Sequence, residues 1–198
     1  MGSTSGSGGG EITHHSPALE QLFERLDPES GLRVLDLGPA ARRNLEHYST
    51  FATRVRFVDL LGGGARRDLT ILEDEAFALR LAGLLPLDDE AYDLVLSWDR
   101  FNYLNETQAA LVARHLAAVA AHGAKLHAMI VTTPTMSAEP MRYQIVGPGE
   151  IAYFTTSPDV VPAPDLSAAR MERWLEPFRV TRSVILRHGV RELLAVSG

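Results

Sequence analysis

The stretch "GLRVLDLGPAARRN", residues 31–44, decides the fold of this chain. Its apolar run is short and is closed by Gly38, a pattern typical of a buried parallel strand that ends in a loop. A helix is expected to follow over 40–51. A strand, a loop and a helix in this order form one side of a ligand crevice, because open α/β sheets bind ligands beyond the carboxyl ends of their strands.

The same alternation continues on both sides of this stretch. Apolar periodicity and capping residues predict helices over 17–26, 40–51, 69–84 and 105–123. Short apolar runs predict strands over 32–37, 54–60, 91–98 and 125–133. Strands that alternate with helices imply parallel pairing through right-handed crossovers. The expected fold class is therefore α/β, with a doubly wound and mainly parallel sheet.

From residue 134 the alternation stops. The proline-rich segment 134–165 predicts a hairpin with strands over 143–146 and 151–155, and we interpret it as an inserted cover over a pocket. Whether its apolar residues face that pocket or a second copy of the chain in a homodimer is left open by the pattern. A short helix over 167–178 precedes two strands, 179–187 and 190–197, which a tight turn at His188 and Gly189 makes antiparallel.

Composition limits the range of functions. The chain has 198 residues, of which 45% are hydrophobic, enough for one domain with a sizeable core. A formal charge of -6 and the lack of a basic cluster argue against a nucleic-acid or anionic-membrane partner. The absence of cysteine excludes disulfides, thiolate metal sites and a cysteine nucleophile, and fits a cytoplasmic protein.

The N-terminus, "MGSTSGSGGG", has no apolar core of signal-peptide length. Its Gly/Ser composition predicts that residues 1–12 form a flexible tail or a tag remnant. The remainder, 13–198, is expected to form a single domain. No spacing of histidine with acidic residues resembles a metal site.

An acidic residue, Asp59, lies 21 positions after Gly38 at the end of the second expected strand. A carboxylate at that place accepts hydrogen bonds from both hydroxyls of a ribose. NAD enzymes and enzymes with other nucleoside cofactors share this feature. The loop "GPAARR" lacks the later glycines of a dinucleotide loop, which disfavours a dinucleotide oxidoreductase.

Three features together resemble the class I S-adenosylmethionine-dependent methyltransferases. These are "VLDLG" at 34–38, "LLPLDDEAYDLVLSWDRFNYL" at 84–104, and the closing antiparallel strand pair, so that the resemblance covers roughly 32–197. It implies a Rossmann-like sheet of seven strands with an antiparallel last strand, and S-adenosylmethionine as cofactor. The implied cofactor site consists of Asp36, Gly38, Pro39, Ala40, Asp59, Leu60, Leu87, Ser97 and Trp98.

The loop departs from the family pattern, because Ala40 and Arg42 stand where the family usually has glycine. If Ala40 has a negative φ the change costs little, whereas a positive φ costs roughly 1–2 kcal/mol. Arg42 and Arg43 either point into solvent or hold the cofactor carboxylate. In a degenerate loop, the Ala40 methyl group or the Arg42 side chain would fill the methionine site.

For catalysis, Asp99 after the fourth strand is the candidate for orienting a nucleophile. His14 and His15 precede the first helix, where relatives often close over the cofactor, so a lid role is considered for them. Methyl transfer mainly requires alignment and exclusion of water, so the sequence carries no fingerprint of the substrate. The first interpretation is methyl transfer to an unidentified small molecule. The alternative is a non-catalytic methyltransferase-like protein that acts through protein contacts.

Overall fold

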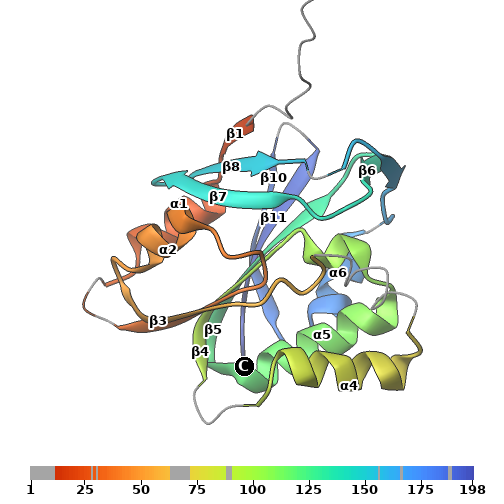
Figure 1. Ribbon diagram of the computed structural model, residues 1–198, viewed down its shortest axis with the longest axis horizontal. Coiled ribbons are helices and arrows are strands. Elements are labelled where there is room, and N and C mark those ends of the chain that lie inside the picture. The colour runs from red at the N-terminus through yellow and green to blue at the C-terminus, as the bar shows by residue number, and fades with distance from the viewer. Residues whose placement is uncertain are drawn as a thin grey trace, which may run out of the picture.

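The computed structural model describes residues 12–27, 29, 31–62, 72–87, 91–155, 157–165, 167–186 and 189–198. The described residues form a six-stranded central sheet in the order β10-β11-β5-β4-β2-β3 (Figure 1). Its strands are β2 (Leu32–Asp36), β3 (Ala52–Phe57), β4 (Tyr92–Trp98), β5 (Ala120–Val131), β10 (Arg179–Leu186) and β11 (Val190–Val196).

The pairing makes this a doubly wound sheet. Strands β3, β2, β4 and β5 are parallel, whereas β11 is antiparallel to both β5 and β10. The chain runs outward from β2 to β3 and then returns to the other side of β2 as β4. The strand order therefore reverses between β2 and β4, the place where such sheets bind ligands.

The seventh strand implied by the resemblance is not among the described residues. After β3 the chain is described to Gly62 and again from Leu72, which leads directly into helix α4 (Asp74–Leu84). The described residues form no further strand beside β3. The expected parallel core and tight closing strand pair are both present.

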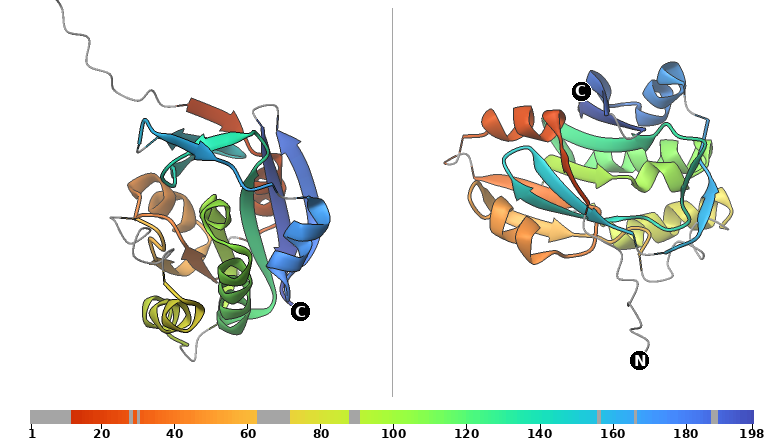
Figure 2. Two further views of the ribbon diagram at one scale, coloured as in Figure 1. Left: turned by 90° about the vertical axis from the view of Figure 1, so that its right-hand side faces the viewer. Right: turned by 90° about the horizontal axis from the view of Figure 1, so that it is seen from above.

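Helices cover both faces of the sheet (Figure 2). Helices α4, α5 (Glu106–Val119) and α6 (Ala168–Leu175) pack on one face, with Phe77, Leu116 and Trp174 in one buried cluster. Helices α1 (Pro17–Glu24) and α2 (Arg42–Tyr48) share the second cluster on the opposite face. Burial from both sides explains why consecutive apolar residues stand in the middle of both strands, Val34 and Leu35 in β2 and 94–96 in β4.

Several boundaries differ from those expected. Helix α2 is shorter than 40–51, because Pro39 and the extended Ala41 keep the chain out of the helix until Arg42. Strand β3 begins at Ala52 and ends at Phe57, earlier at both ends than 54–60. Helix α4 begins at Asp74, and the expected start at 69 lies outside the described residues. Helix α5 ends at Val119, where β5 follows from Ala120.

The segment after β5 forms a cover across the carboxyl ends of the parallel strands (Figure 1). Its hairpin of β7 (Arg142–Gly147) and β8 (Glu150–Phe154) agrees with the sequence prediction, and Gly149 in the turn has a φ of 65°. Strand β1 (Ile12–His15) adds to β8 and makes this a three-stranded sheet. Two short strands, β6 (Thr135–Ser137) and β9 (Val160–Pro162), complete the cover.

The cover is packed onto the rest of the domain. Tyr143, Ile145 and Ile151 are buried in the second cluster, together with Leu19 of α1 and Tyr48 of α2. These apolar side chains therefore face the interior of this chain. Within the described residues, no helix is long and apolar enough to span a bilayer.

Candidate functional site

A buried carboxylate, Asp36, stands at the carboxyl end of β2 where the strand order reverses. One oxygen accepts hydrogen bonds from the Gly38 N–H at 2.8 Å and the Trp98 indole N–H at 2.6 Å. The other accepts from the Tyr48 hydroxyl at 2.8 Å and the Asn44 amide at 3.3 Å. These four donors fill the acceptor capacity of the carboxylate. Asp36 therefore braces the loop through its side chain.

Burial raises the pKa of Asp36 above its ordinary value, while the bonds from Gly38, Trp98, Tyr48 and Asn44 lower it in part. The network joins β2, the loop, α2 and β4. A Cβ at Gly38 would lie 3.1 Å from the Asp36 carboxylate and 3.2 Å from the Trp98 ring, so a larger residue would make these neighbours shift by a few tenths of an ångström.

Trp98 ends β4 in a constrained geometry. Its φ is 50°, the only positive φ at a non-glycine position in the described chain. A positive φ costs about 1–2 kcal/mol for such a residue. The indole bond to Asp36 and the parallel stack on Tyr143, with ring centroids 5.1 Å apart, hold it there. Trp98 thus links the end of β4 both to the loop and to the cover.

Asp59 lies beyond the end of β3, and its side chain is 35% exposed. A Cβ at Gly62 would overlap the Asp59 carboxylate, so this glycine makes room for the acid. The Arg100 Nη2 atom lies 3.7 Å from Asp59 Oδ1. The Asp59 carboxylate is therefore partly accessible to solvent, and it also lies next to the buried guanidinium of Arg100.

Arg100 was not singled out by the sequence analysis, yet it connects most of the site. Its side chain is only 2% exposed, and its Nε donates to the Leu37 carbonyl at 3.1 Å. Nη1 donates to Asp99 Oδ1 at 2.6 Å and to the Met141 carbonyl at 3.3 Å. The sequence signal was an arginine inside the apolar and aromatic run "WDRFNY", where an unpaired charge is costly.

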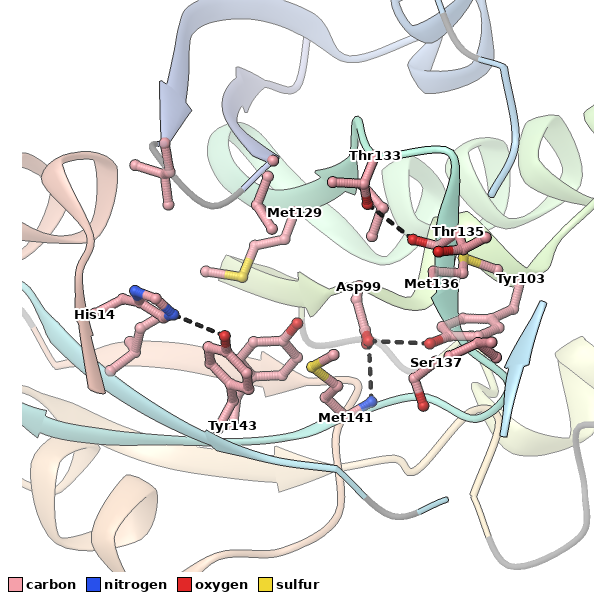
Figure 3. A pocket seen from close by; sticks show the side chains of 17 residues that line it. His14, Asp99, Tyr103, Met129, Thr133, Thr135, Met136, Ser137, Met141 and Tyr143 are labelled. Atoms are coloured by element: carbon pink, nitrogen blue, oxygen red, sulfur yellow. Dashed lines mark hydrogen bonds between the residues drawn. The ribbon is translucent and has the colours of Figure 1, made fainter. Parts of the chain in front are cut away.

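Asp99 lies on the other side of Arg100 and lines a cavity under the cover (Figure 3). Its second oxygen accepts from the Met141 N–H at 3.0 Å and the Tyr103 hydroxyl at 3.4 Å. Burial raises the pKa of Asp99, although the Arg100 charge and the Met141 N–H lower it in part. The neighbouring residues Asp99 and Arg100 thus connect the cavity with the loop after β2 and with Asp59.

The cavity has a volume of about 240 Å³. Its wall is mainly apolar, with Met129 from β5, Met136 and Met141 from the cover, and Val190 from β11. Polar groups are few, and they include Asp99, Ser137 and two threonines (Figure 3). A mostly apolar pocket with a few placed polar groups is the usual form of a small-molecule site.

His14 also lines this cavity. Its Nε2 lies 2.7 Å from the Tyr153 hydroxyl, and the two rings stack with centroids 4.9 Å apart. His15 instead forms a 3.3 Å pair with Glu20, and its side chain is 54% exposed. The segment before the first helix is thus a strand of the cover, with one histidine turned inward.

The two residues that replace the loop glycines lie away from the crevice. Ala40 is exposed and has no positive φ. The Arg42 side chain is 90% exposed and pairs with Glu46 at 2.7 Å along α2. Of the two alternatives considered for Arg42, the structure shows the side chain that points into solvent.

Other residues of the implied cofactor site are more scattered. Ser97 is buried, and its hydroxyl donates to the His127 carbonyl of β5. Leu60 is fully buried in the core, Leu87 is 66% exposed, and Pro39 is half-buried. Residues Asp88 and His188 lie outside the described residues. Asp36, Gly38 and Trp98 form one network, whereas Ser97 and Leu87 lie apart from it.

Comparison with known proteins gives the fold. No protein-family model and no curated protein matches the sequence. An S-adenosylmethionine-dependent methyltransferase from Mesorhizobium loti is 16% identical, with a TM-score of 0.55 over 91% of this chain and 98% of that one. The glycopeptide N-methyltransferase MtfA in complex with S-adenosylhomocysteine is 13% identical, with a TM-score of 0.52 over 93% and 87%.

A third structure is that of the Burkholderia thailandensis 1,6-didemethyltoxoflavin-N1-methyltransferase with bound 1,6-didemethyltoxoflavin and S-adenosylhomocysteine. It is 14% identical, with a TM-score of 0.51 over 90% of this chain and 74% of that one. The chain spans 54% of the length of a further match, the pyocyanin biosynthetic protein PhzM. The chain therefore has the fold of the class I S-adenosylmethionine-dependent methyltransferases.

Proposed function

We propose that this chain transfers a methyl group from S-adenosylmethionine to an uncharged small molecule. The observation that carries the proposal is the pairing of two features on either side of β2, next to the point where the strand order reverses. Asp59 stands accessible at the end of β3, and the cavity lined by Asp99 lies at the end of β4. A donor site and an acceptor site side by side are what methyl transfer requires.

The residues fit the cofactor. The two residues that replace the loop glycines do not crowd the loop, because Ala40 is exposed and the Arg42 side chain points into solvent. Asp59 would accept the ribose hydroxyls, as an acid after the second strand does in this fold. When bound, the cofactor supplies a methyl group that is already activated by a sulfonium.

Arg100 is proposed to position both acids. Its guanidinium lies between Asp59 and Asp99 and is fixed by the Leu37 and Met141 carbonyls. The two carboxylates offset its charge, so the crevice does not present a net cation to a sulfonium. The buried position also means that Arg100 keeps its geometry when ligands enter or leave.

The cavity favours an uncharged acceptor. Three methionines and several aliphatic side chains would contact most of its surface. The acid in the lining, Asp99, is already paired with Arg100, so a charged molecule would lose hydration there without gaining a free opposite charge. Methionine adapts to irregular ligand shapes because its chain is flexible. Asp99, whose pKa burial raises, would accept the hydrogen bond of the acceptor's N–H or O–H and align the lone pair with the methyl group.

A transfer assay tests this proposal. The protein is incubated with methyl-labelled S-adenosylmethionine and with the uncharged, anionic and cationic fractions of a metabolite extract. Label is expected to enter the uncharged fraction. Thr135→Trp, at an exposed residue that lines the cavity, should stop transfer but retain S-adenosylhomocysteine binding. Thr132→Trp, exposed but outside the lining, is the matched control. Label that enters only a charged fraction would contradict the acceptor class.

A further inference from the structure

A second concave site lies at the other end of the sheet. Helix α1 and the strands β5, β10 and β11 enclose a groove of about 500 Å³, within the range of roughly 300–1,000 Å³ common for ligand sites. Its lining residues are Gln21, Leu22, Arg25, Leu26, Lys125, Thr181, Arg182 and Leu194. None of them lines the cavity under the cover.

Three cations from three different elements meet in this groove. Arg25 comes from the end of α1, Lys125 from the first half of β5, and Arg182 from β10. No carboxylate is among the lining residues, and within the described chain no ion pair satisfies any of the three. Elsewhere in the structure, Arg33, Arg42, Arg100 and Arg170 each have an acidic partner.

This concentration of positive charge runs against the composition, because the whole chain has a formal charge of -6. Like charges that share a concave surface repel one another, and the repulsion is relieved by a bound anion. Two of the three are arginines, whose planar guanidinium matches the geometry of a phosphate. The groove therefore selects for an anion with several oxygen atoms.

The other lining residues indicate which further chemical groups the anionic ligand has. Leu22 and Leu194 are buried, and with Leu26 they form an apolar floor. The Gln21 Oε1 atom is buried and has no hydrogen-bond partner among the described residues, so a ligand hydroxyl or N–H that reached it from the groove would satisfy it. A ligand with an apolar body and a hydrogen-bond donor next to its anionic group would therefore match the leucines, Gln21 and the three cations.

We infer that this groove binds a phosphate-bearing small molecule with an apolar body, at a site separate from that of methyl transfer. The phosphate contacts Arg25, Lys125 and Arg182, and the apolar part lies on the leucines. The separation follows from the two linings, which share no residue: on β5 the groove is lined by Lys125 in the middle of the strand, whereas the cavity is lined by Met129 and Val131 at its carboxyl end. Failure of the methyltransferase proposal would leave this inference standing.

The proposed phosphate site is tested by calorimetric titration with three probes, which are 1-naphthyl phosphate, inorganic phosphate and 1-naphthol. The naphthyl phosphate is expected to bind at least tenfold more tightly than either of the other two. Arg25→Gln and Arg182→Gln should each weaken its binding about tenfold. Arg80→Gln removes the same charge from an exposed position on α4 and should leave the binding unchanged.

All these substitutions replace polar side chains outside the core, and their melting temperatures check that the fold persists. Binding of S-adenosylhomocysteine should be the same in every variant, because the groove is a separate site. Equal losses of naphthyl phosphate binding in all three variants would indicate a general charge effect and overturn the inference. So would naphthol binding as tight as that of its phosphate.

Discussion

At the scale of single residues, Asp36 explains why a charged side chain stands inside the apolar run "VLDLG". Its carboxylate is fully buried, and each oxygen receives two donors. Burying a carboxylate costs several kcal/mol in lost hydration, and the four hydrogen bonds to Asp36 offset this cost. Asp36 therefore stabilises the shape of the loop, and in the proposed function Asp59 is the acid that would contact the cofactor.

The replaced glycines lead to the first prediction. Because Ala40 has no positive φ and Arg42 points into solvent, Ala40→Gly with Arg42→Gly should change S-adenosylhomocysteine affinity by less than tenfold, about 1.4 kcal/mol. Isothermal calorimetry on both proteins measures this. A gain of tenfold or more would mean that the parent side chains obstruct the methionine site.

Asp59 carries the second prediction. Asp59→Asn should weaken S-adenosylhomocysteine binding by about 1–3 kcal/mol, the cost of losing a charged hydrogen-bond acceptor. Asp93→Asn is the matched control, because Asp93 is 28% exposed and also pairs with an arginine, Arg33, outside the proposed site. Equal affinities of the two variants, measured by calorimetry, would remove Asp59 from the proposed site.

At the scale of elements, the cover is held to the sheet by its own side chains. Tyr143 on β7 is 8% exposed and stacks on Trp98 at an angle of 2° between the rings. Asn44 of α2 donates to the Tyr143 carbonyl and accepts from the Ile145 N–H at 2.8 Å. The cover is therefore packed against α2 and β4, and its residues Met136, Met141 and Tyr143 line the cavity.

This packing gives the third prediction. Tyr143→Ala should lower the free energy of unfolding by about 3 kcal/mol, the lower end for an aromatic residue truncated in a core. That corresponds to roughly 6–12 °C in melting temperature for a domain of this size. Tyr143→Phe keeps the ring and should change stability little. Thermal melts in which both variants behave alike would show that the stack does not hold the cover.

A second link ties α1 to the sheet. Glu192 on β11 accepts from the Ser16 hydroxyl and, at 3.2 Å, from the Ala18 N–H, and it lies 3.5 Å from His127. Burial alone would raise the pKa of Glu192, but His127, Ser16 and Ala18 together lower it below its ordinary value. The ionised form is therefore favoured in the native state.

The fourth prediction follows from the sign of that shift. A carboxyl group with a lowered native pKa stabilises the fold above its unfolded pKa, about 4.3, and that contribution is lost as the pH falls through the native value. Glu192→Gln should be less stable than the parent at neutral pH, and the difference should shrink toward acid. Urea unfolding at several pH values measures it, and a difference that stays constant with pH would argue against an ionised Glu192 in the native state.

Some of these elements could be predicted from the sequence and others could not, because only some of them depend on local sequence pattern. Strands β2, β4 and β5 and helix α5 carry strong periodicity, so their presence followed from local pattern. Strand β1 has four residues, too few for a pattern, and exists because β8 offers it an edge. Arg100 could not be assigned because its partners Leu37, Asp59 and Met141 come from three distant segments.

At the scale of the whole molecule, the two faces of the sheet are covered by different elements. The cluster around α4, α5 and α6 closes one face, and the cluster around α1, α2 and the cover encloses the second. The proposed site lies at the carboxyl edge between β2 and β4, with the Asp99–Arg100 pair joining its two halves. The central claim is that this edge binds the methyl-donor cofactor.

Calorimetric titration of the intact chain with S-adenosylhomocysteine tests that claim most directly. The proposed site predicts one ligand per chain, with a dissociation constant in the micromolar range. At a hundred times that concentration the ligand should add about 2.7 kcal/mol of stability, which a thermal melt would register. No heat of binding and no change in melting temperature at millimolar ligand would contradict it.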